Sequence, residues 1–302
     1  MIEEKKENTN KFDKRIISSA HINFLFGAGV NGNAFPQLDG FGRTCRKIKE
    51  LGGNVDNGFE NGVDTLENEE DRQSIKRAFI DEFAEKVSQI DFKKESVKNI
   101  ENLLRKTYQI VKESQNRNPD MKQINIYSLN YDNIIERCLM KLGYFSNSIA
   151  ASNVSEVSQL IDVIGYNYNS KKYIPSFMIS KLHGDMSNPI LPGKEKYNKI
   201  IDENYFEIVF NMKAQLSRQN SILIVLGYSG NDKHINKIIH DCIDTGLIVY
   251  WFKYDNKEKM PYESFDNSTI LIREQNDNDE KVDTTKVCFE DLEETWTEKS
   301  EE

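Results

Sequence analysis

Three polar side chains follow directly on apolar runs, at points where strands would end and loops begin. Asn130 and Asp132 come after the run 124–129, and His183 comes after an apolar stretch that ends at Leu182. Histidine has an ordinary pKa of about 6.5 and can accept a proton at neutral pH, so His183 is the leading candidate for a general base. The simpler alternatives are that His183 is a hydrogen-bonded structural residue and that Asp132 caps a helix.

A second set of residues could hold phosphate. Gly27, Gly29 and Gly32 have the spacing G-x-G-x-x-G directly after an apolar run, and a later glycine turn, 227–232, follows the apolar run 221–226. Glycine lets a backbone turn sharply and approach a ligand closely, and exposed amides can cradle a pyrophosphate. Two such turns suit a ligand with two phosphates, so a dinucleotide site is the natural hypothesis. Tight turns required by packing would explain either turn singly.

The region after the first glycine turn disfavours a hydride-transferring dehydrogenase. In those enzymes the second strand ends in an acidic residue about 20 positions on, which holds the adenine ribose. Here residues 45–53 read CRKIKELGG, which has helical spacing and is not followed by an apolar strand.

A sheet is needed to bring these side chains together, and apolar runs that predict buried strands recur along the chain. They are separated by segments of helical periodicity and occupy residues 22–26, 124–129, 221–226, 247–253 and 268–273. This alternation predicts an α/β fold with a parallel sheet flanked by helices, which binds ligands at the carboxyl edge of its strands. Residues 66–115 are helical over a longer stretch than one crossover needs, so we expect a helical insertion at about 60–118.

Length and composition limit the kinds of partner and the cell compartment that are expected for the chain. The chain has 302 residues and a formal net charge of -9, which argues against broad binding to nucleic acid, because phosphate binding needs clustered Lys and Arg. The amino terminus lacks the apolar core of a signal peptide and no apolar stretch is long enough to span a bilayer, so we expect a cytoplasmic protein that binds no membrane.

Residues 1–273 are expected to form one domain. Residues 274–302, with twelve acidic residues and three lysines, are expected to form a solvated, partly mobile tail.

The four cysteines form no C-x-x-C pair. They stand at Cys45, Cys138, Cys242 and Cys288. This scatter predicts neither a disulfide framework nor a structural zinc site.

Four motifs stand in order along the chain: GAG at 27–29, LNYD at 129–132, LHGD at 182–185 and LGYSGND at 226–232. Together they resemble the Sir2-like family, in which a Rossmann-type sheet binds NAD at its carboxyl edge. The resemblance implies that three residues of the first motif, Gly27, Ala28 and Gly29, approach the NAD pyrophosphate. It also implies that Gly227 and Ser229 contact phosphate and the adenine-side ribose.

The same resemblance implies roles for the polar residues. Asn130 and Asp132 would hold the nicotinamide ribose, His183 would be the base, and Tyr254 would lie beside the adenosine. Breaking the bond between nicotinamide and ribose builds positive charge on the sugar, so catalysis needs the ribose held by oriented polar groups. No metal is required.

The chain departs from the deacylating sirtuins, which carry a zinc module of four cysteines beside the acyl-lysine channel. Its scattered cysteines and helical insertion are similar to the bacterial Sir2-like proteins of antiphage defence, which hydrolyse NAD to ADP-ribose and nicotinamide. This resemblance implies an NAD+ hydrolase that acts as the toxic effector of abortive infection and is activated by self-assembly or by another subunit. Two alternatives stay open: an NAD-dependent protein deacylase, and a catalytically silent module that binds NAD or ADP-ribose and regulates a partner.

Overall fold

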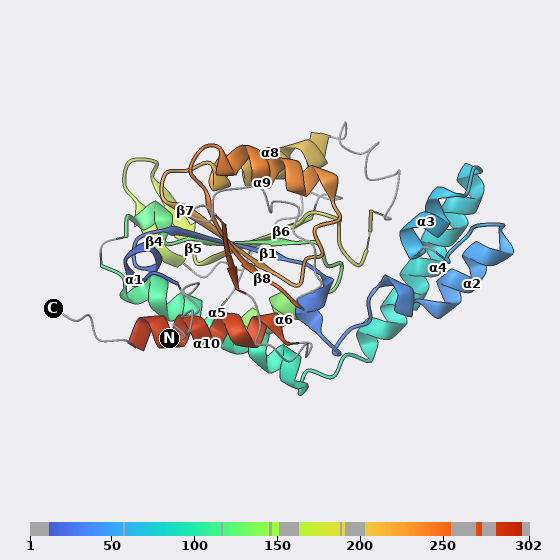
Figure 1. Ribbon diagram of the computed structural model, residues 1–302, viewed down its shortest axis with the longest axis horizontal. Coiled ribbons are helices and arrows are strands. Elements are labelled where there is room, and N and C mark those ends of the chain that lie inside the picture. Colours follow the sequence, from blue (N-terminus) through green and yellow to red (C-terminus); the bar gives the residue numbers. More distant parts are fainter. Residues whose placement is uncertain are drawn as a thin grey trace, which may run out of the picture.

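Seven parallel strands form the central sheet of the computed structural model (Figure 1). The structure describes residues 12–56, 58–115, 117–144, 147–150, 163–187, 189–190, 203–254, 270–273 and 282–297. In spatial order the strands are β3 (Asn147–Ala150), β6 (Phe177–Lys181), β2 (Ile124–Ser128), β1 (His21–Phe26), β7 (Ser221–Leu226), β8 (Ile248–Phe252) and β9 (Ile270–Arg273). A separate antiparallel hairpin pairs β4 (Val163–Asn167) with β5 (Lys172–Pro175).

Helices cover both faces of the sheet (Figure 1). One face carries α8 (Glu203–Leu216) and α9 (Lys233–Ile243). The other face carries α1 (Lys14–Ile17), α5 (Glu95–Glu113), α6 (Ile134–Lys141) and α10 (Thr284–Thr297). The predicted α/β fold, a Rossmann-like parallel sheet flanked by helices, is confirmed.

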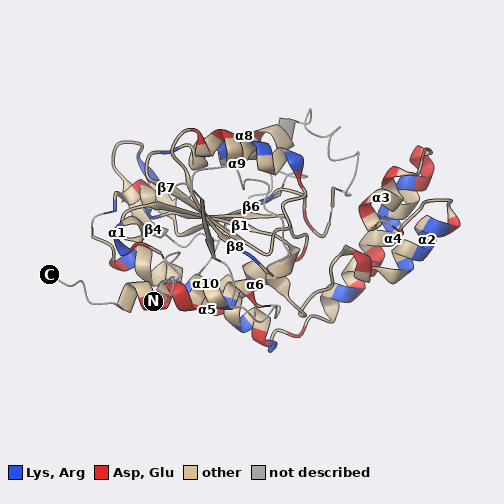
Figure 2. Cartoon of the chain, viewed as in Figure 1, with Lys and Arg blue, Asp and Glu red and all other residues tan. Residues whose placement is uncertain are grey.

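The apolar runs form buried strands because each strand has a core on both sides. All six residues of β1 are buried, and successive side chains point to opposite faces. Phe24 and Phe26 pack into the core under α5, α6 and α10, whereas Leu25 packs into the core under α8 and α9. Figure 2 shows that the charged residues gather on the flanking helices and that the strands are almost entirely uncharged, as expected for strands that are buried on both sides.

The long helical stretch divides differently from the predicted insertion at about 60–118. A helical lobe, defined here as α2 (Gly42–Glu50), α3 (Phe59–Asp64) and α4 (Glu69–Ser88), projects beside the sheet (Figure 1). The second predicted helix, α5, does not belong to this lobe, because it packs against α6 and α10 on the face of the sheet. Periodicity shows that a helix has an apolar side but not which element covers that side.

Glu82 of α4 holds the amino terminus of α2 within the lobe. Its carboxylate accepts hydrogen bonds from the N–H of Thr44 at 2.7 Å, from the Thr44 hydroxyl at 2.8 Å and from the N–H of Arg43 at 3.2 Å. Burial by itself would raise the pKa of Glu82, but these hydrogen bonds outweigh it and the pKa lies below its ordinary value. The ionised carboxylate therefore stabilises the lobe above the ordinary Glu pKa, and this stability is lost as the pH falls through the lower folded-state pKa.

We expect Glu82→Gln to lower the free energy of unfolding by about 2 kcal/mol at pH 7, because an amide replaces a buried charged acceptor. The difference from the unsubstituted protein should shrink as the pH falls below the ordinary Glu pKa and through the lower folded-state pKa of Glu82, because the carboxylate then becomes protonated. Urea denaturation at pH 7 and over a series of acidic pH values measures it. Glu85→Gln is the matched control, since Glu85 forms an exposed ion pair with Arg43 and should contribute little. An equal loss for both variants would contradict the role of Glu82.

The expectation of a solvated tail does not hold for residues 284–297. They form α10, which packs against α5 and β8 and buries Cys288 and Leu292. The spacing of Cys288, Leu292 and Trp296 is that of one helix face, but the many acidic residues around it obscured the pattern. The rest of the predicted tail lies outside the described residues. Among the described helices, none is both long and apolar enough to cross a bilayer.

Candidate functional site

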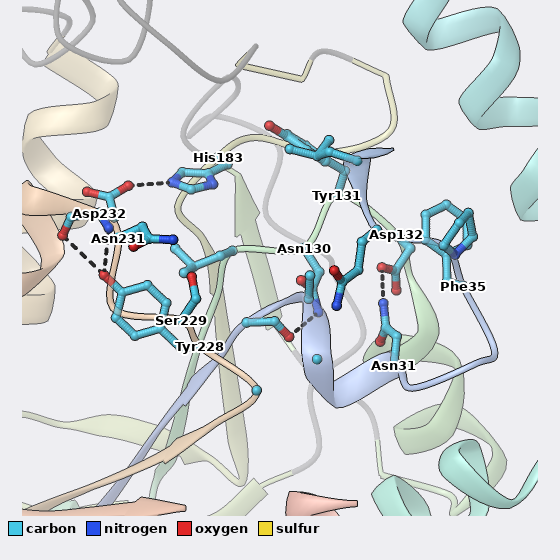
Figure 3. A pocket seen from close by; sticks show the side chains of 18 of the residues that line it. Asn31, Phe35, Asn130, Tyr131, Asp132, His183, Tyr228, Ser229, Asn231 and Asp232 are labelled. Atoms are coloured by element: carbon cyan, nitrogen blue, oxygen red, sulfur yellow. Dashed lines mark hydrogen bonds and ion pairs between the residues drawn. The ribbon is translucent and has the colours of Figure 1, made fainter. Parts of the chain in front are cut away.

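A pocket of about 690 Å³ lies at the carboxyl edge of the sheet, where the segments after β1, β2, β6, β7 and β8 meet (Figure 3). Every residue that the sequence analysis proposed for the site lines this pocket: Gly27, Ala28, Gly29, Asn130, Asp132, His183, Gly227, Ser229 and Tyr254. They come together because parallel strands place their carboxyl ends at the same edge. Their individual roles stay predictions.

The glycine turns after β1 and β7 press against each other. A Cβ on Gly27 would lie 2.3 Å from the carbonyl oxygen of Gly227, and a Cβ on Gly29 would lie 2.8 Å from the Gly227 Cα. The N–H groups of Gly27 and Gly29 donate to the carbonyls of Leu226 and Gly227, each at 3.0 Å. The glycines are therefore needed for the packing of the two turns. The two amides donate hydrogen bonds within the protein, and the approach of Gly27 and Gly29 to a pyrophosphate stays a prediction.

Asn130 lies directly beyond β2 and against the first glycine turn. Its side-chain Nδ2 donates to the carbonyl of Gly27 at 3.1 Å, and its backbone N–H donates to the Ser128 hydroxyl at 3.1 Å. These contacts fix the amide in the lining of the pocket, where it is buried.

Asp132 contacts the protein with both carboxylate oxygens. Oδ2 accepts from Nδ2 of Asn31 at 2.6 Å, and Oδ1 accepts from the N–H of Ile134, the first residue of α6, at 3.0 Å. Burial raises the pKa of Asp132, and the nearby charge of Lys181 acts against this shift. Asp132 therefore orients Asn31 and supports the start of α6.

Asn31 is a pocket residue that the sequence analysis missed, although it stands inside the G-x-G-x-x-G spacing. Asn31 is 2% exposed, and its Oδ1 has no hydrogen-bond partner among the described residues. A buried acceptor without a partner is costly unless a ligand or water satisfies it. Asn31 therefore offers a ligand one hydrogen-bond acceptor at the Asp132 end of the pocket (Figure 3).

Lys181, the last residue of β6, lies buried beneath the turn that carries Asn130 and Asp132. Its ammonium donates to the carbonyl of Tyr131 at 3.3 Å and to the carbonyl of Asp132, and it pairs with Glu136 at 2.9 Å. The side chain is 3% exposed. Lys181 therefore ties the end of β6, two residues before His183, to the turn after β2.

We expect Lys181→Met to lower the free energy of unfolding by about 3 kcal/mol, because it removes the charge that compensates two buried carbonyls and Glu136. Thermal and urea denaturation measure the loss. Lys49→Met is the control: Lys49 pairs with Asp56 at 4.0 Å, and the two side chains are 59% and 79% exposed, so this pair should contribute little. If both variants lost the same stability, Lys181 would be an ordinary surface charge.

His183 meets Asp232 at the other end of the pocket (Figure 3). The His183 Nε2 lies 3.2 Å from Oδ2 of Asp232, and the two side chains are 9% and 8% exposed. The carbonyl of His183 accepts from the N–H of Ile190 at 2.8 Å, which fixes its backbone. The sequence alone did not indicate that His183 pairs with Asp232. It indicated only that Asp232 stands just before a helix, where an aspartate is typical of a capping residue.

Four aromatic side chains, one of them from the lobe, line one side of the pocket. Phe35 and Phe41, in the segment that leads to the lobe, line the pocket together with Phe83 of α4 and Tyr131. The Phe83 ring centroid lies 5.0 Å from that of Phe35, 5.8 Å from that of Phe41 and 6.1 Å from that of Tyr131. The shape of the pocket therefore depends on how the lobe packs against the turn after β2.

Cysteines are spread over four helices, α2, α6, α9 and α10, and all four are free thiols. The part of the chain that the structure describes contains no group of three or more His, Cys, Asp or Glu residues placed to hold a metal ion.

Comparison with known families shows that residues 124–269 are similar to a family described as SIR2-like domain. This match covers just under half of the chain and contains three of the four motifs. No curated protein matches the sequence.

Solved Sir2 structures are similar along most of the chain. A structure described as the structural basis for the mechanism and regulation of Sir2 enzymes is 10% identical, with 94% of this chain and 95% of that chain covered and a TM-score of 0.47. A Sir2 variant with a deacetylated p53 peptide and 3'-O-acetyl-ADP-ribose is 11% identical, with 93% and 96% covered and a TM-score of 0.41. Similarity at this level transfers no activity to this chain. The similarity to the SIR2-like family is therefore shown for residues 124–269.

Proposed function

We propose that the protein is an NAD+ hydrolase that cleaves the bond between nicotinamide and ribose. The observation that carries this proposal is that Asn130 and His183 line the same pocket as the two glycine turns, at the carboxyl edge of the sheet. Asn130 follows strand β2, His183 follows strand β6, and the two glycine turns follow β1 and β7. A dinucleotide at this edge would meet all four segments at once.

The chemistry of the lining residues fits this substrate. Asn130 offers the ribose hydrogen-bonding groups without adding charge. Asn31 offers an acceptor for a ligand N–H, such as that of a carboxamide. With the amides of Gly27 and Gly29 engaged, Ser229 and Asn231 are the side chains of the second glycine turn that could hold phosphate or ribose.

His183 supplies the base in the proposed reaction. As the glycosidic bond breaks, the bonding electrons leave with nicotinamide, which departs as a neutral molecule, and positive charge develops on the ribose. His183 takes a proton from water, or from a ribose hydroxyl that relays it, while the water oxygen bonds to the sugar carbon. The products are ADP-ribose and nicotinamide. Because the leaving group is neutral, the step needs no metal ion.

We further propose that this activity is the toxic output of an antiphage defence system in the cytoplasm. Four cysteines on four separate helices do not form the four-cysteine zinc module that accompanies lysine deacylation in sirtuins. A toxic hydrolase must be held inactive, so activation by self-assembly or by another subunit that senses infection is part of the proposal. The exposed helices of the lobe are the contact surface that we propose for such a partner.

The deciding experiment incubates the purified chain with NAD alone, with NAD and an acetyl-lysine peptide, and with NAD and the products of neighbouring genes. Release of nicotinamide and ADP-ribose without peptide supports the hydrolase. Nicotinamide release that requires the peptide and yields O-acetyl-ADP-ribose supports the deacylase alternative. Binding of NAD without turnover under all conditions supports the silent regulatory module.

A further inference from the structure

Asp232 is held in place from several directions. Its Oδ1 accepts from the N–H groups of His234 and Ile235 at 3.1 and 3.3 Å, at the start of α9. Its backbone N–H lies 3.0 Å from the Tyr228 hydroxyl, and that hydroxyl also lies 2.8 Å from Oδ1 of Asn236. The Tyr228 ring packs 5.6 Å from that of Trp251, in the core under α9.

The two carboxylate oxygens of Asp232 have different partners. Capping of α9 uses Oδ1, and Oδ2 lies 3.2 Å from Nε2 of His183. A helix cap needs only one acceptor, so a serine or threonine would serve α9 as well. The second oxygen and the negative charge act on the imidazole.

We propose that Asp232 is a positioning residue that fixes the tautomer and orientation of His183. Nε2 carries the hydrogen and donates it to Asp232, so Nδ1 is the nitrogen that accepts the proton during catalysis. When Nδ1 takes that proton, the ring becomes an imidazolium beside a carboxylate that stays ionised, and the hydrogen on Nε2 does not move. In a buried setting this arrangement stabilises the positive charge and prevents the wrong tautomer.

The inference depends on the proposed function only for its kinetic consequence, since the tautomer exists without substrate. Asp232→Asn is the decisive variant, because its amide oxygen can still cap α9 while its NH2 group faces Nε2. A donor at that point requires Nε2 to be an acceptor, which moves the hydrogen to Nδ1. Asp232→Ser keeps a capping hydroxyl and leaves Nε2 without a charged partner.

Long-range proton–nitrogen NMR correlations on protein with 15N-labelled histidine measure the tautomer directly. The sequence has four histidines, and the His183 signals are assigned by their loss in His183→Gln. We expect hydrogen on Nε2 in the unsubstituted protein, on Nδ1 in Asp232→Asn, and a mixture of both in Asp232→Ser. Asp241→Asn, on the same helix but paired with Lys213 and Lys237, should leave the His183 signals unchanged.

The kinetic arm measures NAD cleavage under the conditions that activate the unsubstituted protein. Asp232→Asn should lower kcat by about 100-fold and change the KM for NAD less than about twofold. In a protein that already carries His183→Ala, the Asp232→Asn substitution should lower kcat no further. Hydrogen on Nδ1 in the unsubstituted protein, or an unchanged tautomer in Asp232→Asn, would overturn the inference. If Asp232→Asn does not fold, Asp232→Ser decides: an unchanged tautomer overturns it and a mixture supports it. Absence of turnover with the expected tautomers would instead count against the proposed function.

Discussion

His183→Ala and Asn130→Ala are each expected to lower the rate of NAD cleavage by at least about 100-fold. His183→Ala removes the group that we propose as the general base, and general bases contribute about 100- to 10,000-fold. Asn130→Ala removes the hydrogen-bonding group that we propose to hold the ribose, and the loss of such a contact costs about 100- to 1,000-fold. Nicotinamide release, measured by chromatography in the activated state, gives the rates.

The control for the base is His240→Ala. His240 is exposed on α9, where it lies near Asp244 and away from the pocket lining, so its loss should leave the rate unchanged. Thermal denaturation and circular dichroism establish that both site variants remain folded. Full turnover by both His183→Ala and Asn130→Ala would end the assignment of the site.

Gly27→Ala is expected to lower the free energy of unfolding by about 3 kcal/mol, even when no ligand is present. The backbone of Gly27 has a φ of -95°, which any residue can adopt, so the effect is purely steric. The added Cβ would lie 2.3 Å from the Gly227 carbonyl oxygen and 2.6 Å from the Tyr228 Cα. Both are backbone atoms, so the turns after β1 and β7 must move apart. Urea denaturation measures the loss.

Gly42→Ala is the matched control, because a Cβ on Gly42 meets no atom within 4 Å. Its free energy of unfolding should stay within about 0.5 kcal/mol of the unsubstituted protein. A Gly27→Ala protein of normal stability but weak NAD affinity would show that the glycine serves the ligand instead of the packing of the turns.

The polar residues of the site could be predicted from the sequence because each one follows a strand. Apolar runs before Asn130, His183 and Gly227 indicated buried parallel strands, and the carboxyl ends of such strands share one edge. All the proposed site residues line one pocket for that reason. The hydrogen-bond partners of these residues could not be predicted from the sequence, because Asn31 and Asp132 are separated by 101 positions and His183 and Asp232 by 49.

The packing of the helices could also not be predicted from the sequence. The apolar faces of α5 and α10 are visible in the sequence, yet the two helices lie about 190 residues apart and pack against each other only in the folded chain. Composition suggested a solvated end because acidic residues outnumber the apolar ones there. A narrow apolar stripe is sufficient for packing when another helix presents a matching face.

The sequence by itself determined most strands of the sheet, the edge at which their polar residues meet and the residue types available for chemistry. These properties depend on local hydrophobic periodicity and on where each apolar run stops. The tertiary structure alone decided that the glycines serve the contact between two turns, that Lys181 supports the turn after β2, and that Asp232 faces His183. Such contacts join distant segments, and their geometry follows from the packing of the whole sheet with its helices, which no local pattern encodes.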